Sequence, residues 1–271
     1  MSRPGWFVQL VKMAFPGRYL AARATKLPVL GPVLDRWFFE GDHLIYLPKD
    51  RVIPIDETIE LPGETVLPSQ VVEHFILQAS THWIMDRCIC RDGNQCKDYP
   101  IDLGCLFLGE AASRINPSLG RRVTVEEALA HVRRCREAGL VHLIGRNKLD
   151  TVWLGVGPGE QLLTICNCCP CCCLWGMLPY LSPEIGAKIT RMPGVTVAVN
   201  SQCIGCGTCT QGVCFADAIH LVEGRAVIDE ACRSCGRCVE VCPQAAIELS
   251  IERGRFVEES VARISPLVDL S

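Results

Sequence analysis

Two runs of closely spaced cysteines near the C-terminus constrain the fold of this chain more than any other feature. The members of the two runs, in chain order, are Cys203, Cys206, Cys209 and Cys214, then Cys232, Cys235, Cys238 and Cys242. Within each run two residues separate the first three thiols from one another, and Pro243 directly follows the second run. A loop with thiolates at this spacing can wrap one face of a [4Fe–4S] cube, because each sulfur then reaches a different iron. The pattern therefore predicts iron–sulfur centres and a fold that is built around them.

Residues from about 199 to 252 resemble a bacterial, clostridial-type ferredoxin with two [4Fe–4S] clusters. In such ferredoxins the fourth cysteine of each run ligates the cluster of the other run. The resemblance therefore implies one cluster on Cys203, Cys206, Cys209 and Cys242, and a second on Cys214, Cys232, Cys235 and Cys238. It also implies that the two runs fold as one unit, because each half completes the other.

The end of the first run departs from the ferredoxin pattern. Four residues lie between Cys209 and Cys214, where the usual pattern has three, and Phe215 occupies the position where proline is expected. The number of thiols is unchanged, but the loop after Cys209 must be longer. Pairs with C-x2-C spacing also bind zinc, so a pair of zinc knuckles is the competing interpretation. Duplicated four-cysteine runs with crossed partners favour iron–sulfur clusters.

Cysteine content and charge limit the compartment and the partners. The chain has 271 residues, of which 19 are cysteines. Apolar residues make up 49% of the chain. The spacings fit metal sites better than disulfides, and no signal peptide is evident. We expect a reducing cytoplasm in an anaerobe, because exposed clusters and thiols are oxidised readily. A formal net charge of −3 gives no overall footprint for nucleic acid, and no apolar run is long enough to predict a membrane-spanning helix.

Changes in composition divide the chain into segments and predict an α+β protein. In this prediction a cysteine-rich α+β N-terminal and middle region precedes a bacterial ferredoxin-like domain with two clusters. The predicted segments are a basic N-terminal arm with a Pro-rich strap (1–68), a cysteine-rich α+β domain (69–198), the ferredoxin-like domain (199–252) and a C-terminal tail (253–271).

The first 34 residues are basic and contain no acidic residue. A short apolar block between Trp6 and Phe15 is broken by Lys12 and ends at Pro16-Gly17, which disfavours a signal peptide. Such an arm can pack on its own protein, dock on a partner subunit or lie on an anionic membrane surface. All three interpretations remain open from the sequence.

A second cysteine-rich region follows a predicted helix, whose apolar residues recur at helical spacing from Ser69 to Asp86. Its cysteines form two patches: Cys88, Cys90, Cys96 and Cys105, then Cys166, Cys168, Cys169, Cys171, Cys172 and Cys173. Neither patch alone has a regular cluster-binding frame, so we expect ligands from both patches and one or two further clusters. A thiol-rich core or a zinc site is the alternative, since zinc accepts any four thiolates in tetrahedral geometry.

Three motifs in this region are Cys88-x-Cys90-Arg91, the stretch 139–142 and the stretch 165–169. With these motifs, residues from about 70 to 250 resemble a group of cysteine-rich ferredoxin-like proteins of anaerobic prokaryotes. In that group such a part precedes two ferredoxin repeats, as it does here. The resemblance implies iron–sulfur chemistry and supplies no substrate.

The stretch between the two patches predicts ordinary elements. Thr124 and Glu127 form a capping box for a helix that ends at Gly139, and Cys135 on its apolar stripe is predicted to be a buried, inert thiol. Strands are predicted over 141–144, 151–154 and 161–165, and in the ferredoxin-like domain over 194–200, 219–222, 225–228 and 246–251. The glycines at 155, 157 and 159 predict a hairpin turn, because the lysine and helix of a phosphate loop are missing.

The residues predict electron transfer through clusters that change by one electron at a time. We expect an iron–sulfur electron-transfer protein or subunit that relays low-potential electrons to or from a larger redox enzyme, with the basic arm as a docking element. It would be cytoplasmic, or bound to the cytoplasmic face of a membrane. One alternative is a reductase with a substrate-facing cluster or reactive thiols in the middle domain, near Arg87, Arg91, His131, His142 and Lys148. The other is a zinc-stabilised binding module.

Overall fold

A seven-stranded sheet forms the centre of the protein in the computed structural model, which describes residues 2–50, 67–252 and 256–271. The strand order is β4-β2-β3-β6-β5-β1-β7, and all neighbours are antiparallel except β1 and β7. The strands are β1 (His43–Tyr46), β2 (His82–Met85), β3 (Leu106–Leu108), β4 (Gly120–Val123), β5 (Val141–Arg146), β6 (Leu163–Cys168) and β7 (Ile189–Arg191).

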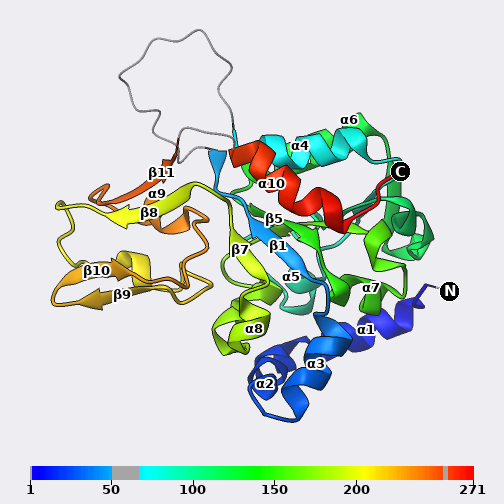
Figure 1. Ribbon diagram of the computed structural model, residues 1–271, viewed down its shortest axis with the longest axis horizontal. Coiled ribbons are helices and arrows are strands. Elements are labelled where there is room, and N and C mark those ends of the chain that lie inside the picture. Colours follow the sequence, from blue (N-terminus) through cyan, green and yellow to red (C-terminus); the bar gives the residue numbers. More distant parts are fainter. Residues whose placement is uncertain (1, 51–66, 253–255) are drawn as a thin grey trace, which may run out of the picture.

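Two small antiparallel sheets form a separate lobe beside β7 (Figure 1). One pairs β8 (Val195–Val199) with β11 (Ile247–Ile251), and the other pairs β9 (Ile219–Val222) with β10 (Arg225–Ile228). All eight cysteines of the two C-terminal runs lie within this lobe, between β8 and β11. Helices and sheets together confirm the predicted α+β class.

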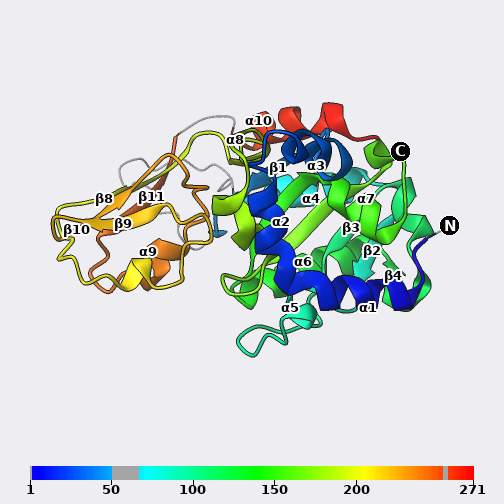
Figure 2. The ribbon, with the colours of Figure 1, turned by 90° about the horizontal axis from the view of Figure 1, so that it is seen from below.

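Helices cover both faces of the large sheet (Figures 1 and 2). The helices are α1 (Gly5–Ala14), α2 (Arg18–Ala24), α3 (Leu30–Phe38), α4 (Ser69–Gln78), α5 (Ile89–Gly93), α6 (Val125–Glu137), α7 (Lys148–Leu154), α8 (Pro183–Gly186), α9 (Arg237–Val241), which lies in the lobe, and α10 (Phe256–Ile264). Short 3₁₀ helices connect them: η1 (Phe15–Gly17), η3 (Glu110–Arg114), η4 (Pro117–Leu119), η5 (Gly159–Gln161), η6 (Leu174–Tyr180), η7 (Thr208–Thr210) and η8 (Ser265–Leu267).

Alternation along the strands separates two hydrophobic cores, because successive side chains of a strand point to opposite faces. Ile45 and Ile165 belong to the core beneath α4, α6 and α10. Tyr46, Leu143 and Cys168 belong to the core on the other face, which α2, η6 and part of the lobe complete. Cysteines on β6 therefore face the lobe side of the sheet, away from α4, α6 and α10.

Several predicted elements are confirmed. The Thr124 side chain accepts a hydrogen bond from the Glu127 backbone, and the Glu127 carboxylate accepts one from the Thr124 backbone, which completes the capping box of α6. Strands are present at 195–199 and 247–251, and 219–222 pairs with 225–228 as a hairpin. Cys135 is fully buried, as its place on the apolar stripe predicted.

Three predicted elements are wrong. The helix expected to reach Asp86 ends at Gln78, because Ala79 is extended, and β2 follows it. All four side chains of β2 are buried, so this strand shows no alternation that would distinguish it from a helix. The strand expected over 151–154 is part of α7, which Gly155 ends in a left-handed conformation. The glycines after it therefore lead from a helix to β6 and do not join two strands.

Two terminal segments contain more structure than the sequence indicated. The predicted strap begins with β1, which lies inside the large sheet, while 51–66 falls outside the described residues. The predicted tail contains α10, which packs on α4 through the shared core that includes Phe256 and Phe75.

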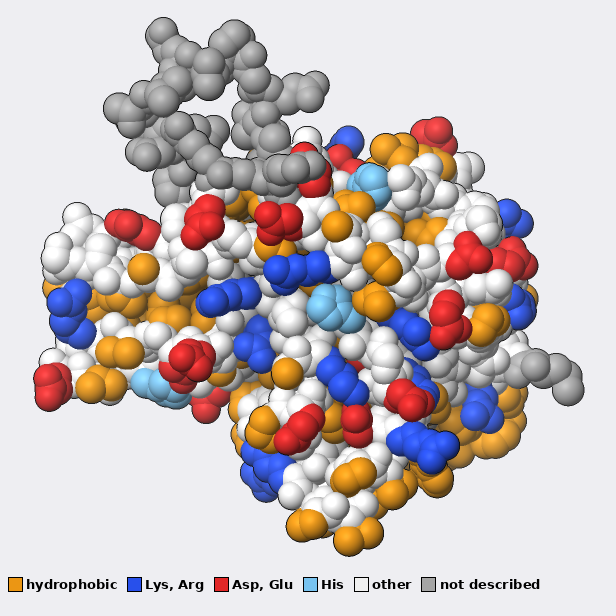
Figure 3. All heavy atoms as spheres, viewed as in Figure 1, with side chains coloured by type: hydrophobic (Ala, Val, Ile, Leu, Met, Phe, Trp, Pro, Cys, Tyr) orange, Lys and Arg blue, Asp and Glu red, His pale blue; other side chains and the backbone are white. Residues whose placement is uncertain are grey.

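The N-terminal arm packs on its own protein, which is one of the three interpretations of the sequence. Val8 and Phe15 are buried, and Lys12 forms an ion pair with Asp92 at the end of α5. The outer side of the arm exposes apolar side chains, among them Trp6 and Met13. Figure 3 shows apolar side chains between Lys and Arg over the lower part of the molecule, where α1–α3 lie. Within the described ranges, no helix combines the length and the apolar character that crossing a membrane requires.

Candidate metal centres

The first ferredoxin-type set lines one small pocket in the lobe. Its thiols come from the loop that leads into η7 and from the end of α9, and they are Cys203, Cys206, Cys209 and Cys242. Burial raises the pKa of Cys209, and the negative charges of its neighbours raise it further: Cys242, Cys206 and Cys203. Four thiols around one pocket fit a cube, which needs a thiolate on each of four irons.

The second ferredoxin-type set lies at the side of the lobe that faces the large sheet. Burial raises the pKa of Cys238, and three neighbouring thiolates add to the effect: Cys235, Cys232 and Cys214. Cys214 and Cys232 pack against the core that contains Tyr46. The structure thus brings together both crossed sets that the ferredoxin resemblance implies, and their role as cluster ligands remains a prediction.

The two cysteine loops repeat each other in backbone conformation. Gly207 follows Cys206 with φ +77°, and Gly236 follows Cys235 with φ +80°. This left-handed conformation favours glycine, which has no Cβ to clash with the neighbouring carbonyl. The turn after the second cysteine of each run therefore depends on glycine.

Backbone N–H groups point at the sulfurs of both sets. Donor and sulfur are 3.2–3.4 Å apart in four bonds, from Ala226 to Cys203, Ala246 to Cys242, Ala218 to Cys214 and Ser234 to Cys232. Such donors stabilise negative charge on sulfur and are one of the means by which a protein sets a cluster potential.

Ten cysteines of the middle region separate into two groups. The six-thiol group lines a pocket of about 140 Å³ between α1, α5, β6 and η6 and consists of Cys88, Cys90, Cys105, Cys166, Cys168 and Cys173. Cys169, which belongs to the second group, also reaches the wall of this pocket. Cys166 and Cys168 share a face because they are two residues apart on β6. Leu106 pairs with Ile165, so continuing the register places Cys105 opposite Cys166. Both sequence patches contribute to this group.

The six-thiol group contains two thiols that ionise easily. A hydrogen bond from the Cys90 thiol and the nearby Arg91 guanidinium lower the pKa of Cys88 to about 7, although burial opposes this. The thiols of Cys166 and Cys173 lower the pKa of Cys168 well below its usual value. Since the thiolate is the metal-binding form, such thiols are suited to be ligands.

Arg91 lies fully buried beside these thiols. It donates hydrogen bonds to three backbone carbonyls, those of Pro100 at 2.8 Å, Asn167 at 2.7 Å and Leu103. Burial acts to lower its pKa, but neighbouring thiolates outweigh this and raise it above the usual value, chiefly those of Cys88, Cys169 and Cys105. The guanidinium is thus a fixed positive charge among the middle cysteines.

The other polar residues that the sequence nominated for a substrate site have structural partners. Arg87 pairs with Asp92 at 2.7 Å, and Lys148 pairs with Glu40 at 2.9 Å. His131 and His142 are buried. His142 bonds Asn167 through Nδ1 at 2.8 Å, and burial lowers its pKa to about 4, so it is neutral at neutral pH. His131 bonds the Gly104 carbonyl at 2.9 Å.

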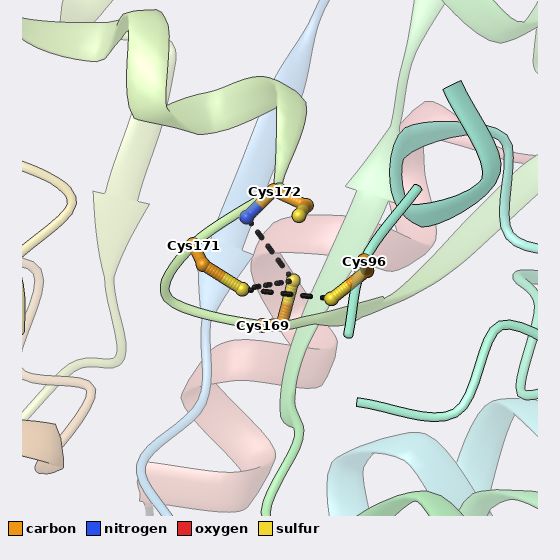
Figure 4. A group of neighbouring side chains, drawn as sticks. All are labelled: Cys96, Cys169, Cys171 and Cys172. Carbon is orange, nitrogen blue, oxygen red and sulfur yellow. Dashed lines mark hydrogen bonds between the residues drawn. The ribbon is translucent and has the colours of Figure 1, made fainter. Parts of the chain in front are cut away.

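The four-thiol group is the second group of the middle region (Figure 4). It consists of Cys96, which follows α5, and three residues of the loop after β6, namely Cys169, Cys171 and Cys172. All four sulfurs lie within 4.8 Å of one another. The sequence did not reveal how the middle cysteines divide into two groups. The division depends on the side of the loop after β6 to which each thiol points.

Aromatic and cationic side chains connect the second ferredoxin-type set with the six-thiol group. Phe215, directly after Cys214, packs on Tyr46 with ring centroids 4.4 Å apart. The Tyr46 hydroxyl lies 3.8 Å from the Cys168 sulfur. Buried Arg237 donates to the Cys168 carbonyl, and its charge interacts with Cys235 and Cys168. Sequence reasoning missed Tyr46 and Arg237; the unusual Phe215 was the one available signal.

Sequence comparison identifies the metal chemistry of the lobe. The 4Fe-4S binding domain family matches residues 226–248, which include the second cysteine run. A component of the ion-translocating oxidoreductase complex of Methanosarcina acetivorans is 54% identical over 48 residues, 17% of this chain and 18% of that protein. A component of the Na⁺-translocating ferredoxin:NAD⁺ oxidoreductase complex of Acetobacterium woodii is 40% identical over 72 residues, 23% of this chain and 21% of that protein. No solved structure matches this chain.

The matched part spans about a fifth of the length of these curated relatives. Together with the family match, it confirms the predicted resemblance of the C-terminal part to ferredoxin-type iron–sulfur proteins. An iron–sulfur cofactor is therefore established for the lobe at the level of the domain.

Proposed function

We propose that this protein relays low-potential electrons between a redox partner and a larger oxidoreductase through two [4Fe–4S] clusters in the lobe and a third cluster in the six-thiol group. Each cluster would supply a change of one electron. The chain holds the sulfurs in place, shields them from water and sets the charge around them. The two relatives are named as subunits of oxidoreductase complexes, which supports a role as a subunit.

The observation that carries this proposal is the contact between the lobe and the sheet. Phe215, Tyr46 and Arg237 fill the space between the second ferredoxin-type set and Cys168. Electron transfer depends above all on short separation, and this buried contact keeps the two thiol sets close. A lobe that worked alone would have no reason to dock its second set against the middle cysteines.

The six-thiol pocket fits a buried relay better than a substrate site. Its walls include the apolar side chains of Val11 and Phe15 from the arm, together with Trp153 and Trp175. The charged and amide side chains of this pocket each form a hydrogen bond within the protein, and they are Arg91, Asn147, Asp150 and Asn167. Two buried atoms of pocket residues, Asn147 Oδ1 and Trp175 Nε1, have no hydrogen-bond partner. Few groups in the pocket could therefore bind a polar substrate. No specific observation favours the reductase, and the family match disfavours a zinc module in the lobe.

The arm supplies a docking surface in this proposal. Its exposed apolar side chains include Trp6, Leu10 and Met13 on α1 and Trp37 on α3. Basic residues such as Arg23 lie exposed among them, which suits an anionic lipid surface. Both named relatives belong to ion-translocating complexes, which supports a peripheral position at a membrane.

Metal analysis and redox titration of the full chain, purified without oxygen, test the proposal. We expect about twelve irons and a similar amount of sulfide per chain, four for each of three cubes. After reduction with titanium(III) citrate, one electron per cluster should pass to an oxidised viologen, which becomes its radical. Electron paramagnetic resonance should show coupled spins, because reduced clusters lie close together.

Two variants test whether the six-thiol group holds the third cluster. Cys166→Ser should lower the iron content by about four per chain and leave the lobe clusters intact. Cys135→Ser, at a buried thiol outside every group, should leave the iron content unchanged. Protein without iron and sulfide, or clusters that do not exchange electrons with viologen, would refute the proposal.

A further inference from the structure

The four-thiol group differs from the other thiol sets in its compactness. Cys171 lies 3.7 Å from both Cys96 and Cys169, measured between sulfurs. Four sulfurs at a Zn–S distance of 2.3 Å in a regular tetrahedron are about 3.8 Å apart. The observed separations therefore match a single tetrahedral ion at the centre of the group.

A cube does not fit between these sulfurs. In a [4Fe–4S] site each thiolate binds a different iron, so the whole inorganic core must lie between the thiolates and holds them farther apart than ligands of one ion. Among the described residues, neither ferredoxin-type set forms a group as compact as this one. The structure thus distinguishes sets that suit a cube from one that does not.

Backbone hydrogen bonds in the four-thiol group also suit a single ion. The Cys172 N–H donates to the Cys169 sulfur at 3.3 Å, across a C-x2-C step (Figure 4). Burial opposes ionisation of the Cys96 thiol, but the backbone of Asp98 and Tyr99 lowers its pKa. The loop after β6 thus turns around the sulfur of Cys169.

The fixed guanidinium of Arg91 offsets part of the charge at the group. Four thiolates around one divalent ion have a net negative charge. Arg91 is fully buried, and the thiolate of Cys169 is one of the neighbours that raise its pKa. The same guanidinium faces Cys88 and Cys105 of the six-thiol group. It therefore lies between the two groups and compensates charge in both.

We propose that Cys96, Cys169, Cys171 and Cys172 bind one Zn²⁺ ion in a tetrathiolate site that is separate from the iron–sulfur clusters. The ion joins the segment after α5 to the loop after β6, the two stretches that also carry cysteines of the six-thiol group. The zinc site is thus structural: all four positions are filled by protein, so none remains open for a substrate.

Metal analysis of the full chain, purified without oxygen and dialysed against a chelator, tests the site. We expect about one zinc per chain, with four sulfurs near 2.3 Å by X-ray absorption at the zinc edge. Cys96→Ser and Cys171→Ser should lose the zinc and keep iron and sulfide. Cys166→Ser should keep the zinc and lose about four irons with their sulfide, and Cys135→Ser should keep both metals.

Each outcome decides the assignment. Wild-type protein without zinc would overturn it, as would a single iron without sulfide in this site. Loss of about four irons with sulfide from Cys96→Ser would also overturn it, since the group would then hold a cube. If the serine variants do not fold, the absorption spectrum of the wild type still decides. Protein with zinc here and no iron anywhere would refute the electron relay and leave this inference standing.

Discussion

The ring of Phe215 packs against the ring of Tyr46, with centroids 4.4 Å apart and planes tilted by 34°. Phe215 belongs to the lobe and follows Cys214, whereas Tyr46 ends β1 in the large sheet. Both side chains are buried, and Tyr46 is completely inaccessible. The residue that departs from the ferredoxin pattern is thus one of those that attach the lobe to the rest of the protein.

Phe215→Ala should destabilise the attachment of the lobe. Removing a buried phenylalanine costs about 3–5 kcal/mol, because packing is lost and a cavity remains. We expect faster hydrogen exchange in β1 and slower electron transfer between the lobe and the six-thiol group, measured by rapid-freeze electron paramagnetic resonance. Val222→Ala, at an exposed position of the same lobe, is the matched control. Equal effects of the two variants would contradict the prediction.

Tyr46→Phe should lower the potential of the cluster in the six-thiol group. The hydroxyl near Cys168 stabilises negative charge on that sulfur, and such hydrogen bonds help to set cluster potentials. A potentiometric titration should show one midpoint moving to a more negative value while the lobe clusters keep theirs. Tyr180→Phe serves as control, since the Tyr180 ring packs on Tyr19. An unchanged midpoint in Tyr46→Phe would argue against a cluster beside Cys168.

Arg91→Lys should destabilise the middle region although it keeps the charge. The planar guanidinium of arginine donates to three carbonyls at once, which the ammonium of lysine cannot reproduce. Each buried carbonyl left without a donor lowers the free energy of unfolding by about 1–3 kcal/mol. We expect a lower midpoint in chemical denaturation and faster loss of metal. The exposed Arg87→Lys should behave like the wild type. Wild-type stability in Arg91→Lys would show that charge alone matters here.

Asp42→Asn should stabilise the protein at neutral and higher pH. Burial raises the pKa of Asp42 to about 7, and one of its oxygens has no hydrogen-bond partner. The folded state therefore holds a proton that the unfolded state releases near pH 4, so wild-type stability falls as the pH rises from about 4 to 7. We expect a gain of about 4 kcal/mol at pH 8, and less than half of it at pH 5, by anaerobic urea denaturation. A gain independent of pH would contradict this titration.

Replacing Trp6 and Met13 together by serine should weaken binding to anionic vesicles. These side chains are 65% and 77% exposed on α1, so the double variant should fold normally. Sedimentation with vesicles that contain phosphatidylglycerol measures the bound fraction. Leu77→Ser, with a side chain 65% exposed on α4, is the matched control. No binding of the wild type to these vesicles would contradict the prediction.

The sequence predicted best those elements whose signals are local. The capping box at Thr124 satisfies backbone groups within one turn, and the hairpin at 219–228 pairs neighbouring segments. The two C-terminal cysteine runs could also be recognised from the sequence, because loops that bind clusters have a characteristic spacing of cysteines. These features need no information from distant parts of the chain.

Tertiary contacts decided the elements that the sequence did not predict. Asp150 accepts hydrogen bonds from Trp153 and from Thr164 on β6, which supports α7 where the β-branched run suggested a strand. In the same way, the division of the middle cysteines follows from the pairing of β3 with β6 and from Arg91. Spacing alone contains neither fact.

The pairing of β8 with β11 means that the chain enters and leaves the lobe at one place, and α10 then returns to pack beside α4. The ferredoxin-like part is therefore connected to the main body at both of its ends, unlike a domain joined by a single flexible linker. We expect the lobe to keep a fixed position relative to the large sheet throughout turnover. The rate of electron transfer between the clusters should therefore not depend on solvent viscosity. A single protease cut within the lobe should leave both fragments attached to the main body.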